Sequence, residues 1–166
     1  NLQEFLPPTR ITLLPLTMKE LRRARGVNFV SFTPGTSFDM RSSLGTAEER
    51  ALLYHLLRRA WNLNEGAKHA LEGWKSRERF EWLLANFATA SIDGVLRDKF
   101  VEQANQTPGL RDRFADISQR YSRVRSARRV DDERILARNR IIADLRLLLA
   151  QTCLSELEPD LIFLDE

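Results

Sequence analysis

The chain ends on an apolar run that leads directly into two acids, Asp165 and Glu166, in the sequence LIFLDE. If the run is a buried parallel strand, its carboxyl end brings both side chains to the crevice where phosphates bind in α/β proteins. Asp165 would then hold Mg²⁺, and Glu166 would activate an attacking water. The pattern is short, and a plain strand end or tail of the same composition is the alternative.

A second stretch with possible chemistry is Thr33-Pro34-Gly35, which follows the apolar segment VNFVSF at residues 27–32. Glycine allows another backbone to approach closely, and amides at the start of a following helix favour an anion. The stretch therefore suits contact with a phosphate of a nucleic-acid backbone. A simple turn uses the same residue types and is the alternative.

The order of these two stretches resembles the first motor domain of superfamily-two helicases and translocases of the DEAD-like kind. In that family a Thr-Pro-Gly motif lies on the strand before the Asp-Glu strand, which is the Walker B strand. The segments NFVSFTPGTSFDMRSSLGTAEERALLYHLL and ELEPDLIFLDE look like parts of large bacterial helicase-related proteins. The resemblance implies Asp165 as the Mg²⁺ and nucleotide ligand, Glu166 as the catalytic residue, and Thr33, Pro34 and Gly35 at the nucleic-acid backbone.

The sequence departs from this family in three respects. No phosphate loop of the form G-x-x-x-x-G-K-[ST] can be drawn anywhere in it, and the second motor domain with its arginine finger is absent. The separation between the Thr-Pro-Gly and Asp-Glu stretches is also far longer than in compact helicases. We therefore expect a fragment of an ATP-dependent nucleic-acid helicase or translocase, whose parent uses ATP and Mg²⁺. The isolated chain is expected to be inactive and to hold neither ligand. Its first residue, Asn1, agrees with a piece of something longer.

Arginines gather between residues 120 and 140, and four of them, Arg123, Arg125, Arg128 and Arg129, are candidates for nucleic-acid contacts. Guanidinium groups fork onto phosphates, so the cluster would give salt-dependent binding without sequence preference. The alternative is a solvated helix face whose charges pair four residues apart, as Asp116 and Arg120 would. Acids interspersed among these arginines dilute the positive field.

Strands at both ends of the chain and helices between them must position these residues. Strands are predicted at about residues 9–17, 27–32 and 160–164, because each is an apolar or β-branched run near Pro or Gly. The predicted fold class is mainly α, a helical bundle over about residues 46–157. The strands are expected to belong to an incomplete RecA-like α/β domain.

Three segments follow from this reading: a partial motor segment with the Thr-Pro-Gly motif at 1–45, a helical insertion at 46–157, and the Walker B strand at 158–166. Thr46, with Glu49 three residues later, predicts a capping box at the start of the insertion. Further helix starts are predicted at Ser91 and at Thr107-Pro108.

Apolar spacing predicts which faces of these helices are buried. One stripe recurs at spacings of four, three, four and three residues, which is typical of a helix packed along a seam. Its members are Leu110, Phe114, Ile117, Tyr121 and Val124. The final helical segment, IIADLRLLLAQTCL, is apolar around most of its circumference and should lie centrally in the core.

Composition narrows the class of protein. Hydrophobic residues make up 43% and charged residues 30%, which is ordinary for a soluble domain. Cys153 is the only cysteine, so no internal disulfide is possible and a reducing, cytoplasmic location is expected. Its apolar setting predicts a buried structural thiol. His55 and His69 have no cysteine or acid cluster at ligand spacing, which argues against a zinc site.

A function of another class fits the same residues. The chain could be a non-catalytic helical module that binds protein or nucleic acid. The expected partners are DNA or RNA for the parent protein and the remainder of its motor domain. No membrane is expected, because no run approaches about 18 consecutive apolar residues.

Overall fold

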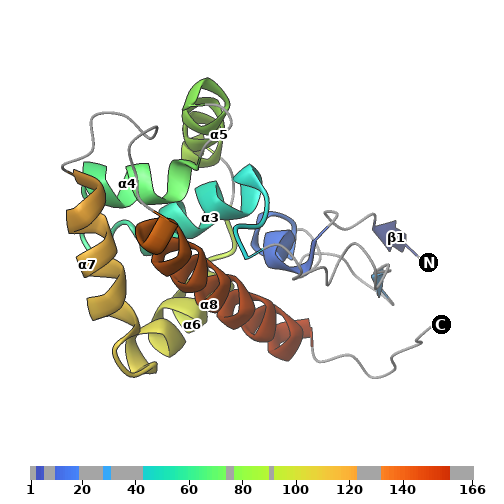
Figure 1. The fold of residues 1–166 in the computed structure, drawn as a ribbon. Coiled ribbons are helices and arrows are strands. Elements are labelled where there is room, and N and C mark those ends of the chain that lie inside the picture. The colour runs from blue at the N-terminus through green and yellow to red at the C-terminus, as the bar shows by residue number, and fades with distance from the viewer. Residues whose placement is uncertain are drawn as a thin grey trace.

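The computed structural model describes residues 3–5, 10–18, 28–30, 43–73, 77–89, 92–122 and 132–157. Helices form nearly all of this described part (Figure 1). In chain order the elements are β1 (Gln3–Phe5), a 3₁₀ helix η1 (Ile11–Leu16), β2 (Asn28–Val30), α3 (Ala47–Leu57), α4 (Glu65–Glu72), α5 (Arg77–Thr89), α6 (Gly94–Gln106), α7 (Leu110–Ser122) and α8 (Asp132–Leu157).

The prediction that the strands belong to a RecA-like α/β domain is wrong for this part of the chain. Its only strands are β1 and β2, each three residues long, and they pair in parallel with Phe5 opposite Val30. β2 lies within the predicted strand 27–32, whereas the predicted strand 160–164 lies outside the described residues. A pair of three-residue strands is too small to carry a motor domain, and the helical bundle is what remains of the prediction.

The predicted strand at 9–17 is instead the 3₁₀ helix η1. Short apolar runs do not distinguish a buried strand from a buried helical turn, so periodicity could not decide here. Pro15 lacks the N–H that a central strand needs. Ile11, Leu13 and Leu14 are buried, and η1 contacts α3 and α8, so packing against helices determines its conformation.

The capping box that opens the bundle is confirmed. The Thr46 hydroxyl accepts from the Glu49 backbone N–H at 3.2 Å, and the Glu49 carboxylate accepts from the Thr46 N–H at 2.7 Å. The predicted cap at Ser91 is wrong by two residues, because Asp93 occupies the cap and accepts from Leu96 N–H. Thr107 closes α6, and α7 begins three residues later, at Leu110.

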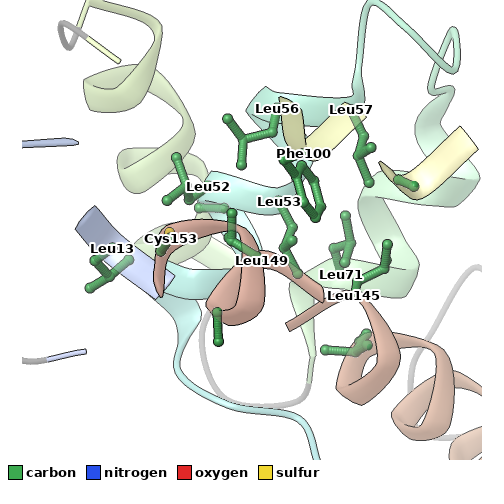
Figure 2. Packing of buried hydrophobic residues seen from close by; sticks show 14 of the residues in the cluster. Leu13, Leu52, Leu53, Leu56, Leu57, Leu71, Phe100, Leu145, Leu149 and Cys153 are labelled. Atoms are coloured by element: carbon green, nitrogen blue, oxygen red, sulfur yellow. The ribbon is translucent and has the colours of Figure 1, made fainter. Parts of the chain in front are cut away.

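The core is built around α3, which contacts α4, α5, α6, α8 and η1. Leu52 and Leu53 of α3 are fully buried, and Figure 2 shows them among Phe100 of α6 and Leu145 and Leu149 of α8. Each such side chain contributes about 1.5–3 kcal/mol when fully buried. The last helical segment thus contributes buried residues to the core as predicted, but it is not central, because its other face is exposed, with Leu147 at 50% and Leu154 at 42%.

The predicted seam along α7 is also confirmed for its described members. Leu110, Phe114, Ile117 and Tyr121 are all buried, while Val124 lies outside the described residues. α7 packs chiefly against α4 and also contacts α6 and α8. In Figure 1, α4 and α7 lie at one end of the helical part and α5 stands out at its edge.

Candidate functional site

The best-built polar assembly in the described part surrounds the buried carboxylate of Glu49. We call it the Glu49 cluster; it comprises Arg10, Thr12, Thr46, Glu49 and Arg146. The Thr12 hydroxyl donates to Oε1 of Glu49 at 2.7 Å, and Nε and Nη2 of Arg146 lie 3.1 Å from the same oxygen. Oε2 accepts from the Thr46 N–H and lies 3.7 Å from Nε of Arg10.

Both charges at the centre of the Glu49 cluster are withdrawn from water. The Glu49 side chain is 1% exposed and that of Arg146 is 0% exposed. Burying a charge is costly unless it is paired and hydrogen-bonded, and here each ion supplies that compensation for the other. The cluster therefore holds η1, α3 and α8 in one arrangement, and its carboxylate is already occupied by donors.

Gly45 makes this arrangement possible at the entrance to α3. A Cβ atom at this position would lie 2.2 Å from Nε of Arg146, and the backbone has φ of +63°. Only glycine combines that conformation with so close an approach at little cost. The Arg146 guanidinium thus passes directly against the backbone that precedes the capping box.

Arg50, the next residue along α3, is buried against carbonyl groups rather than an acid. Its Nε donates to the Leu71 carbonyl at 2.7 Å and its Nη2 to that of Glu72 at 3.2 Å, at the C-terminus of α4. Its Nη1 donates to the carbonyls of Leu44 and Gly45. A cation is favoured at a helix C-terminus.

Burial, followed by the nearby charge of Arg138, lowers the pKa of Arg50 to about 10. Arg50 therefore remains charged at neutral pH. Its four carbonyl contacts join α4 to the segment before α3, so Arg50 ties together a different set of elements from the Glu49 cluster.

A shallow hollow lies where α4 meets α7. We call it the α4–α7 hollow; its volume is about 180 Å³, and its walls are residues 61–64, Ala67 and one face of α7. The α7 face contributes Arg111, Ser118, Gln119 and Ser122 among others. No aspartate or glutamate lines this hollow.

A second hollow, of about 240 Å³, lies between the start of α7 and α8. Leu110, Leu147 and Leu148 give it an apolar wall, and Arg113 and Asp144 form an ion pair of 2.9 Å at its side. Both of these charged side chains are about half exposed. This hollow has the character of an ordinary surface gap closed by a solvated ion pair.

The residues predicted to carry chemistry lie outside the described part. This applies to the two acids, Asp165 and Glu166, and to the Thr33-Pro34-Gly35 stretch. It also applies to the four candidate arginines, Arg123, Arg125, Arg128 and Arg129. Their roles stay predictions. The alternative ion pairing proposed beside the arginines is confirmed, because Arg120 and Asp116 pair at 2.8 Å.

The other potentially reactive side chains have structural surroundings. Cys153 is 0% exposed, and burial raises the pKa of its thiol far above the usual range, so the thiol is unreactive. His55 Nε2 lies 2.9 Å from the Leu84 carbonyl and joins α3 to α5. Burial, only partly offset by that hydrogen bond, lowers the pKa of His55.

The described residues lack two kinds of feature that would point to a class of site. No group of three or more His, Cys, Asp or Glu side chains in this part is arranged to hold a metal ion. Among its helices, none is both long and apolar enough to cross a membrane. The described part thus offers a buried structural cluster and two surface hollows.

Sequence reasoning missed the Glu49–Arg146 pair. The local pattern predicts Glu49 only as a capping residue and Arg146 only as part of an apolar helix. The available signal was a lone arginine inside IIADLRLLLAQTCL, since a charge in a helix that is apolar all round needs a buried partner.

Comparisons with known proteins give this chain no relative. A scan against protein-family models, a search of curated proteins and a search of solved structures each found no match.

Proposed function

We propose that the chain is part of an ATP-dependent nucleic-acid helicase or translocase, and that its helical part, about residues 46–157, is a non-catalytic module of that protein. The observation that carries the proposal is the buried Glu49–Arg146 pair, which joins α3 to α8 across 97 positions of the sequence. Through this pair α8 packs against α3, close to residues 10–18 and 44–46, which lead into the helices.

Such a closure is what an inserted module requires. A module carried within another domain must bring its first and last helices together near the points where the chain enters and leaves. The flanking sequences support the same reading, because they hold the Thr33-Pro34-Gly35 stretch on one side and Asp165-Glu166 on the other. In the proposal Asp165 binds Mg²⁺ with ATP, and Glu166 activates water, in the parent protein.

The module itself is proposed to bind rather than to catalyse. The most completely built carboxylate of the described part, Glu49, is occupied by its donors, and the one cysteine is buried. Arg123, Arg125, Arg128 and Arg129, which follow α7 in the sequence, are proposed to contact phosphates. A reducing, cytoplasmic setting belongs to the same proposal, since Cys153 needs no partner.

The test is ATP hydrolysis by the parent protein, measured as phosphate release with and without single-stranded DNA or RNA. We expect stimulation by nucleic acid, and a loss of at least about 100-fold in kcat for Glu166→Gln. The isolated 166-residue chain should release no phosphate. Turnover by the isolated chain that Glu166→Gln abolishes, or a parent with no hydrolysis under any condition, would contradict the proposal.

A second candidate is a helical binding module unconnected with any motor. Its support is that η1, the helices, Met18 and Trp61 supply the main core as far as the structure describes it. A parent protein that binds its partner but never hydrolyses ATP would support this candidate instead.

A further inference from the structure

The α4–α7 hollow has the chemistry of an anion site. The donors in its lining are the Arg111 guanidinium and side-chain amides, since the Ser118 and Ser122 hydroxyls already donate to backbone carbonyls of α7, and it contains no carboxylate. We propose that it receives a phosphate group of a single-stranded nucleic-acid backbone. The choice of nucleic acid over another anionic polymer rests on the proposed function, whereas the preference for an anion rests on the lining alone.

Arg111 differs from the other described arginines of its helix. Arg113 is paired with Asp144 at 2.9 Å, and Arg120 is paired with Asp116 at 2.8 Å. Within the described residues Arg111 has no ion pair, and it is the only one of the three that lines the hollow. A guanidinium in this position keeps its donors for a phosphate from outside the chain.

The walls of the hollow are held in place before any ligand arrives. The Trp61 indole donates to Asn105 at 2.8 Å and packs on Phe114, with ring centroids 5.5 Å apart. The Asn64 side chain caps α4 by accepting from Ala67 N–H. A Cβ at Gly66 would lie 2.1 Å from the Ser118 carbonyl oxygen, so α4 and α7 pack backbone to backbone.

The size of the hollow favours a segment of a polymer over a free small molecule. Pockets for drug-sized ligands or cofactors are about 300–1,000 Å³. A hollow of about 180 Å³ holds one small anionic group instead. The lining face of α7 extends from Arg111 to Ser122, about 16 Å along the helix, which lets a strand continue beyond the hollow.

The experiment measures binding of the full 166-residue chain to a fluorescent 20-nucleotide single strand, by anisotropy at 50 and 200 mM salt. We expect Arg111→Ala to weaken binding by about three- to tenfold at 50 mM salt and to lower the salt slope by about one. Arg113→Ala, two residues away on the same helix, is the matched control and should bind like the unchanged chain. Circular dichroism and thermal melting check that both variants fold.

Each outcome decides the inference. Equal binding by the Arg111→Ala and Arg113→Ala variants, or no binding by the unchanged chain at 50 mM salt, overturns it. Polyglutamate that competes as well as the oligonucleotide would make the site one for acidic protein segments and overturn the choice of nucleic acid. The hydrolysis test uses another variant, Glu166→Gln, and another readout, so a failure of this inference is distinguishable from a failure of the proposed function.

Discussion

Two ion pairs of nearly equal length lie in contrasting parts of the molecule. Arg146 and Glu49 lie 3.1 Å apart with side-chain exposures of 0% and 1%. Arg113 and Asp144 lie 2.9 Å apart with exposures of 53% and 45%. Because water solvates the second pair and not the first, the same chemistry has different consequences: the buried pair organises three elements, and the exposed pair adds little.

Arg50 is a third case, because it is a buried arginine that has no direct ion pair with an acid among the described residues. Its donors are taken up by four carbonyls from two separate segments. Its charge is therefore dispersed over dipoles, including those at the C-terminus of α4. Burial and then the nearby charge of Arg138 lower the pKa of Arg50.

The largest effect is expected for Arg146→Met. The substitution removes the fully buried counter-ion of Glu49 and leaves only Arg10, 3.7 Å from Oε2, so we expect the free energy of unfolding to fall by about 3–5 kcal/mol. Urea unfolding followed by circular dichroism measures it.

Combining Arg146→Met with Glu49→Gln is the control for that prediction. The double variant removes both charges, and it should recover a large part of the loss. A cost below about 1 kcal/mol for Arg146→Met alone would show that the pair does not organise the fold.

An intermediate effect is expected for Arg50→Met. It leaves the carbonyls of Leu44, Gly45, Leu71 and Glu72 without their donor, at an expected cost of about 2–3 kcal/mol in the free energy of unfolding. Hydrogen exchange should locate the loss in α4 and at the start of α3. Protection that falls evenly over all helices would contradict a local role.

The smallest effect is expected for Arg113→Ala. Removing this exposed pair should change the free energy of unfolding by less than about 1 kcal/mol, and 0.5 M NaCl should reduce even that difference. Arg146→Met should keep its cost at high salt, because buried pairs are screened much less. Equal salt sensitivity of the two variants would remove the distinction between the pairs.

The helices were largely predictable because they depend on local chemistry. Thr46 and Glu49 form the expected capping box, and Leu110, Phe114, Ile117 and Tyr121 share the expected buried face. The strand predicted over residues 9–17 failed because its apolar composition suits either a strand or a helical turn, and its neighbours α3 and α8 decided between them.

The candidate sites show the same division between features set by local sequence and features set by packing of distant segments. The Thr-Pro-Gly and Asp-Glu stretches were found from short patterns of residue types, and they lie outside the described residues. The α4–α7 hollow could not be predicted, because its walls come from residues 61–67 and from a helix that starts at Leu110. No local sequence pattern predicts that these two segments pack against each other.

By itself the sequence determined a helical protein with a capped first helix, a packed seam on α7 and an apolar last helix, since spacing and capping act over a few residues. Only the tertiary structure decided that Arg146 pairs with Glu49, 97 positions earlier, and that Arg111 is left without an intramolecular ion pair in the described part. The physical reason is that the partner and the solvation of a charge depend on which distant elements pack around it.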